Sequence, residues 1–80
     1  MARYFLHLRD SHDELLDPEG KELHDMEQLR AFVLKTARDL LAGDIHNGLI
    51  DFRFRIDAED GAGHIVYSMP FKHAVNIIPE

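Results

Sequence analysis

The residue types needed for acid–base and metal chemistry are plentiful, because 80 residues include fifteen Asp or Glu and six histidines. Neutral imidazole is a common metal ligand, and two such rings on one helical face make a recognisable site. No two histidines have the short helical spacing that such a pair needs, and four of them fall in predicted turns or at strand ends. We therefore predict solvated histidines, no bound metal and no cofactor. The histidines are His7, His12, His24, His46, His64 and His73.

Two further chemistries can be weighed against the sequence. Asp57 to Gly61 begins like a calcium loop, but the twelfth position is Ser68 where an EF-hand needs a bidentate Glu. The available hydroxyl nucleophiles, Ser11, Thr36 and Ser68, lie outside any nucleophile-elbow pattern. We predict no catalytic residues and no enzymatic activity, with a small enzyme built on an acid–base pair as the minor alternative.

One surface collects positive charge in an otherwise acidic chain. If two strands turn their apolar sides to a helix, their other sides bring together basic and aromatic residues. This face could bind an acidic protein, or single-stranded RNA stacked on Phe5. The alternative that we favour is ordinary cross-strand ion pairing on a wet face. The candidate binding residues are Arg3, Phe5, His7, Arg53 and Arg55, with Arg9, Asp51 and Asp57 beside them.

A helix is the best-specified element. Asp25 followed by Gln28 forms a capping-box pattern, and Gly43 is suited to end a helix, so we predict a helix from Met26 to Ala42. Its apolar residues recur at helical spacing and form one stripe that should face the core. They are Met26, Leu29, Phe32, Val33, Ala37, Leu40 and Leu41.

Alternating polarity predicts the strands that position the charged face. We expect strands at Arg3–Arg9, Glu14–Leu16, Leu49–Asp57 and His64–Met69, the last ended by Pro70. Phe71, Ala74 and Val75 predict one terminal helical turn that packs back on the sheet. The fold class is α+β: residues 1–80 form a single domain with a small antiparallel sheet of three to four strands and one long helix on one face, in the order β-β-α-β-β.

The composition of the chain limits its possible partners and its cellular location. The net charge of −6 disfavours nucleic acid and anionic membrane surfaces as partners, and no apolar run has the ~18 residues of a membrane span. The chain has no cysteine and no export signal, so we expect a soluble cytoplasmic protein. A chain this short buries only about 60% of its unfolded surface. Together with a half-apolar edge at Ile65 to Met69, this predicts a homodimer.

Several motifs carry a resemblance. Tyr4-Phe5 with His7 to Asp10, the Asp17 to Gly20 turn, Ala37 to Leu41, the Asp60 to Gly63 loop and the Pro70 to Val75 closing segment together resemble a family of short proteobacterial proteins grouped as a domain of unknown function. The likeness covers nearly the whole chain and implies no particular activity. An acidic-Gly turn leading into an Ala- and Leu-rich helix is also similar to small antitoxin domains of the HicB type.

We therefore expect a small protein-interaction or regulatory module that self-associates and could also bind a protein partner. The alternative from another class is an antitoxin-like or nucleic-acid-binding regulator that uses Arg53 and Arg55.

Overall fold

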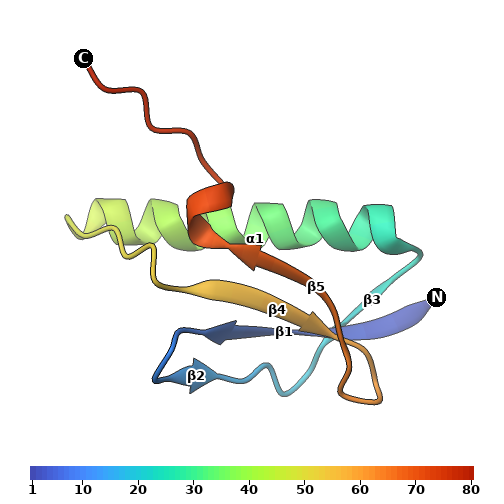
Figure 1. The fold of residues 1–80 in the computed structure, drawn as a ribbon. Coiled ribbons are helices and arrows are strands. Elements are labelled where there is room, and N and C mark those ends of the chain that lie inside the picture. The colour runs from blue at the N-terminus through green and yellow to red at the C-terminus, as the bar shows by residue number, and fades with distance from the viewer.

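A long helix lies across one face of an antiparallel sheet in the computed structural model, which describes all 80 residues (Figure 1). The α+β class and the long helix on one sheet face agree with the sequence prediction. The elements in chain order are β1 (Ala2–Arg9), β2 (Glu14–Leu15), β3 (Lys21–Leu23), α1 (Met26–His46), β4 (Arg55–Glu59), β5 (Ile65–Pro70) and the 3-10 turn η1 (Phe71–His73).

The helix begins where the capping box predicts. The Asp25 carboxylate accepts a hydrogen bond from the Gln28 N–H at 2.9 Å, and the Gln28 side-chain oxygen accepts one from the His24 N–H at 2.9 Å. The predicted end at Ala42 was wrong, because the helix runs through Gly43 to His46. The left-handed residue that follows its end is Gly48, at φ +83°. A glycine inside a helix costs only about 1 kcal/mol, so one glycine does not end it.

Strand β1 is the centre of the sheet. It pairs with β4 on one side, and on its other side with β3 near its start and β2 at its end. The prediction for the first strand and for the short strand at residues 14–16 is confirmed, whereas β3 was expected only as a lead into the helix. Between β2 and β3 the Asp17 carboxylate accepts the Leu6 N–H at 3.2 Å, so a side chain completes this edge.

The predicted strand Leu49–Asp57 was wrong over its first six residues, because β4 starts only at Arg55. Asp51 accepts hydrogen bonds from the Arg53 N–H at 2.9 Å and from the Arg53 guanidinium at 2.8 and 3.0 Å. An Asp that bonds the backbone two residues ahead favours a turn over a strand. Strand β5 matches its prediction closely, and a bulge interrupts its pairing with β4 between Ala58 and Glu59.

The core lies between α1 and the sheet. Phe71 in η1 is buried, and its N–H donates to the Phe54 carbonyl at 3.0 Å, so the predicted terminal turn packs back on the sheet. Leu40 was expected in the apolar stripe but is exposed, because the buried face of α1 follows Leu29, Val33, Ala37 and Leu41. The fully or nearly buried apolar residues are Leu23, Leu29, Val33, Ala37, Leu41, Ile56, Ala58, Met69, Phe71 and Ala74. Neither α1 nor η1 combines the length and the apolar character that a membrane-spanning helix requires.

Candidate functional site

The open face of the sheet, on the side away from α1, carries a network of charged groups around Asp57. Asp57 is only 1% exposed and accepts hydrogen bonds from the Ser68 hydroxyl at 2.6 Å, Arg9 at 3.1 Å and Arg55 at 3.2 Å. Burial by itself raises the pKa of Asp57, but these three donors together bring it below its ordinary value. The carboxylate is therefore held ionised in a nearly dry position.

Arg9 joins this carboxylate to two others. Its guanidinium donates to Glu59 at 2.8 Å, to Glu14 at 3.0 Å and to Asp57 at 3.1 Å, and these carboxylates raise the pKa of Arg9. Arg9 and Arg55 are direct cross-strand partners, which would repel each other without a counter-charge. Asp57 lies within hydrogen-bonding distance of both and supplies that counter-charge.

His7 ties the network to the turn between β2 and β3. Its Nδ1 accepts the Asp17 N–H at 3.0 Å, so the proton of the neutral ring is on Nε2, which lies 3.5 Å from Glu59. The Asp17 carboxylate accepts the N–H groups of Glu19 and Gly20, each at 3.1 Å. Burial raises the pKa of Asp17, while the three backbone N–H donors lower it and prevail.

This network is better suited to holding strands together than to catalysis. Ser68 donates to a carboxylate that already has two arginine partners, and both ring nitrogens of His7 face Asp17 and Glu59. A nucleophile needs a base that is free to take its proton, and no such pair is formed here. Every buried side-chain polar atom of the chain has a hydrogen-bond partner. The arrangement matches the ion-pair interpretation of this face.

The five predicted binding residues are only partly brought together. His7 and Arg55 lie on the open face, and the Phe5 ring stacks near His7 with centroids 6.5 Å apart. Arg3 is at the start of β1, where it donates to the Glu19 carbonyl and the Glu22 carboxylate. Arg53 was expected on the same strand face, but it lies in the turn before β4 and pairs with Asp51. Their role in binding stays a prediction.

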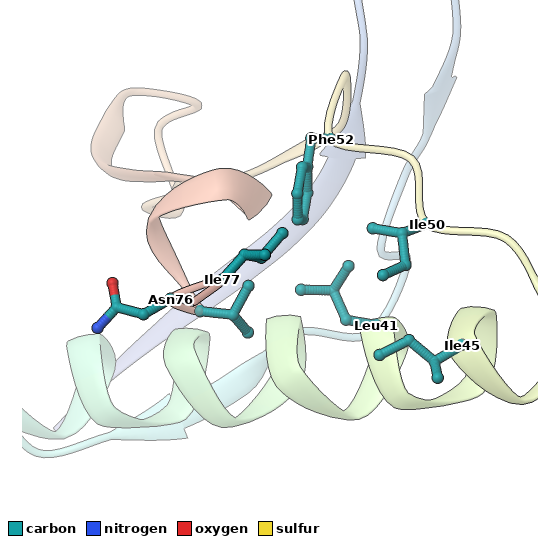
Figure 2. A pocket seen from close by; sticks show the side chains of 7 residues that line it. Leu41, Ile45, Ile50, Phe52, Asn76 and Ile77 are labelled. Carbon is teal, nitrogen blue, oxygen red and sulfur yellow. The ribbon is translucent and has the colours of Figure 1, made fainter. Parts of the chain in front are cut away.

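An apolar groove lies at the C-terminal end of α1, and sequence reasoning did not identify it (Figure 2). Its volume is about 270 Å³. Ile50 and Phe52 of the loop before β4 face Leu41 and Ile77 across it, while the carboxamide of Asn76 points away. The lining residues are Leu41, Ile45, Ile50, Phe52, Val75, Asn76 and Ile77.

Large exposed apolar side chains surround this groove. Ile45 and Ile50 line it while remaining substantially exposed, and Leu49 beside them is exposed too. Ile77 and Ile78 belong to segment 75–80, which follows η1 without forming a helix or strand. Residues 75–77 line the groove, and the end of the chain extends away from the body of the domain (Figure 1). Exposed apolar residues that gather in one place are typical of a contact surface. We call the groove and these neighbours the apolar end of the molecule.

Comparison with protein-family models gives a match over most of the chain. Residues 3–72 match the family model described as "Domain of unknown function (DUF6894)". No curated protein and no solved structure matched the chain.

Proposed function

Since the chain belongs to the family described as Domain of unknown function (DUF6894), which carries no assigned activity, we propose its role from its own surface: it is a protein-interaction module that self-associates as a homodimer. The observation that carries this proposal is the amount of surface that a single copy leaves exposed. Only 12 of the 80 residues are buried.

The excess surface has the size of an interface. A compact monomer of 9.2 kDa should expose about 4,900 Å² by the usual scaling of surface with mass. This chain exposes 5779 Å², which is roughly 850 Å² more. A standard protein–protein interface buries about 800 Å² on each partner. The surplus is therefore what one partner of a stable dimer would cover, and a second copy is the partner that is always present.

The shape of the chain supports the same proposal. Its radius of gyration is 13.1 Å, whereas a compact domain of this length has a value of about 11.6 Å. The shortest extent is 18 Å, which corresponds to a single helix layer on a single sheet layer. Two such thin bodies can cover each other's apolar surface without any change in fold.

The charges favour a protein partner over nucleic acid. Arg3, Arg9, Arg53 and Arg55, the arginines that the sequence assigned to the charged face, all donate to carboxylates of their own chain, so none of these four is an unpaired cation for phosphate. The net charge of −6 would repel a polyanion. Two copies of an acidic chain also repel each other, and salt screens this repulsion. Dimerisation should therefore strengthen with added salt, whereas binding to nucleic acid would weaken.

Gel filtration with light scattering tests this proposal. We expect a mass near twice 9.2 kDa at micromolar concentration, with a larger dimer fraction at 500 mM than at 50 mM NaCl. A monomer at both salt concentrations contradicts the proposal. Titration with single-stranded RNA at low salt serves as the comparison, and tight binding that is lost at high salt would favour the nucleic-acid alternative instead.

A further inference from the structure

We propose that the groove of each copy receives the Ile78 side chain of the other copy, with Pro79 beside it, while Asn76 and Ile77 stay in the wall of their own groove. This inference rests on the proposed dimer and goes beyond it, because it assigns the contact to the apolar end and names the residue that enters. The exchange is mutual, as a two-fold interface requires.

The groove has room for such an insertion. Its volume of about 270 Å³ exceeds the 150 Å³ of an apolar cavity that accepts a benzene molecule. Six of its seven lining residues are hydrophobic, so a polar or charged group would lose its hydration there without gaining a partner. An aliphatic side chain is the group that fits this chemistry.

Ile78 is free to be that side chain. It is 90% exposed, the highest value among the large apolar residues of the chain. Its neighbour Ile77 already forms part of the groove wall, and successive side chains of an extended segment point to opposite sides. Ile78 is therefore directed away from its own groove, and a groove on another copy can receive it.

The segment around Ile78 is also prepared for insertion. It carries no charge before Glu80, so no ion must be desolvated. Pro79 restricts Ile78 to extended conformations, which reduces the conformational entropy that is lost on binding. Pro79 also lacks an N–H that would otherwise need a partner in an apolar interface.

The open edge of the sheet at β5 is a poorer site for the contact. The Phe71 N–H donates to the Phe54 carbonyl, so the backbone groups of Phe71 point toward β4. In an antiparallel pair, successive residues point their backbone N–H and C=O groups alternately toward the paired strand and away from it. Ser68 and Pro70 therefore point theirs to the open edge. Pro70 offers no N–H, and the bulge opposite Glu59 disturbs the other end of the strand. A short strand with a bulge and a proline is protected against edge pairing. The edge from Ile65 to Met69, which suggested a dimer from the sequence, is therefore not where we place the interface.

Matched charge substitutions separate the two locations. Ile78→Asp and Ile77→Asp place a carboxylate at the proposed contact, and Ile65→Asp places one on β5. Ile77 and Ile65 have similar exposed fractions, 67% and 55%, so the substitutions should perturb the monomer alike. We expect Ile78→Asp and Ile77→Asp to raise the Kd of dimerisation at least about 100-fold, because a buried unpaired carboxylate is costly, and Ile65→Asp to change it less than about threefold.

Sedimentation velocity over a concentration series measures these constants, and circular dichroism confirms that each variant is folded. A wild-type dimer that Ile78→Asp leaves intact overturns the insertion while the proposed function stands. A dimer broken by Ile65→Asp alone moves the interface to the β5 edge and also overturns it. A wild-type chain that is monomeric throughout the series contradicts the proposed function itself.

Discussion

Replacing Arg9 should destabilise the domain more than replacing its buried partner Asp57. Arg9→Met keeps most of the apolar stem and removes the charge, so Asp57 stays buried with only Ser68 and the partly exposed Arg55 as donors. Asp57→Asn instead removes the buried charge itself and leaves Arg9 with Glu59 and Glu14. The asymmetry follows from the cost of a buried ion without its full counter-charge.

The magnitudes can be worked from these contacts. Breaking a buried ion pair costs about 3–5 kcal/mol, and the side chain of Arg9 is 19% exposed, so we expect the lower end, about 3 kcal/mol, for Arg9→Met. For Asp57→Asn we expect about 1–2 kcal/mol, because its hydrogen bonds weaken and Arg55 loses its counter-charge, while solvent screens the partly exposed Arg55 and Arg9 keeps Glu59 and Glu14. A domain of this size has a total stability of about 4–12 kcal/mol, so the first loss is a large share.

Urea unfolding at pH 7 followed by circular dichroism measures both changes. With an m-value of about 1.5 kcal/mol/M, Arg9→Met should lower the midpoint by about 2 M and Asp57→Asn by about 0.7–1.3 M. Arg53→Met is the control, because Arg53 is exposed and solvent screens its bidentate pair with Asp51, so its loss should lower the midpoint less than either of the other two substitutions. Equal losses for the first two variants, or a larger loss for Asp57→Asn, would refute the reasoning.

Three other predictions test the fold. Gly43→Ala should raise the free energy of unfolding by about 0.5–1 kcal/mol in urea titrations, because Gly43 is helical and an added Cβ meets nothing within 4 Å. Destabilisation would show instead that Gly43 ends the helix. Gly20→Ala should cost at least about 2 kcal/mol by the same assay, since its φ is +75° and the Cβ would lie 2.8 Å from the Tyr4 carbonyl oxygen; an unchanged midpoint would contradict this close approach. Stability should fall as the pH drops below about 5. Burial raises the pKa of Asp17 and of Asp57 in the folded chain, but their hydrogen bonds outweigh it and bring both pKa values below the ordinary 3.8. The unfolded chain therefore binds protons at a higher pH than the folded chain does. Thermal melts between pH 7 and pH 2.5 would show this, with a smaller decrease for a folded Asp17→Asn variant, and a flat profile would rule it out.

The parts of the fold that the sequence predicted are those with local chemical signals. Asp25 and Gln28 act on backbone groups within one turn, so the helix start could be predicted from a few residues. Gly43 and Gly48 could each adopt the left-handed conformation that follows a helix end, so residue type alone does not show where the helix ends. In the structure Gly48 has this conformation and Gly43 lies inside the helix. Strand β3 is too short for a periodic pattern, and only its pairing with β1 makes it a strand.

The charged face of the sheet could also be predicted only in part from the sequence. Alternation correctly placed His7, Arg9, Arg55 and Asp57 on one side of the sheet. It could not show that Asp57 is buried, because its burial depends on Arg9 and Arg55 from neighbouring positions and on Ser68 of the next strand. It also placed Arg53 with them, although Asp51 holds Arg53 in a turn.

The misleading pattern and the proposed contact involve the same residues. Ile50 and Phe52 alternate with Asp51 and Arg53 as a strand would, yet they belong to a loop because the Asp51 carboxylate binds the Arg53 N–H. Phe52 packs partly buried against the core, Ile50 stays 44% exposed, and both line the groove. Local rules are expected to fail where a sequence serves function rather than folding. In residues 49–54 the exposed Ile50, and not Phe52, is therefore the side chain that folding leaves without a partner and that the proposed contact at the apolar end would cover.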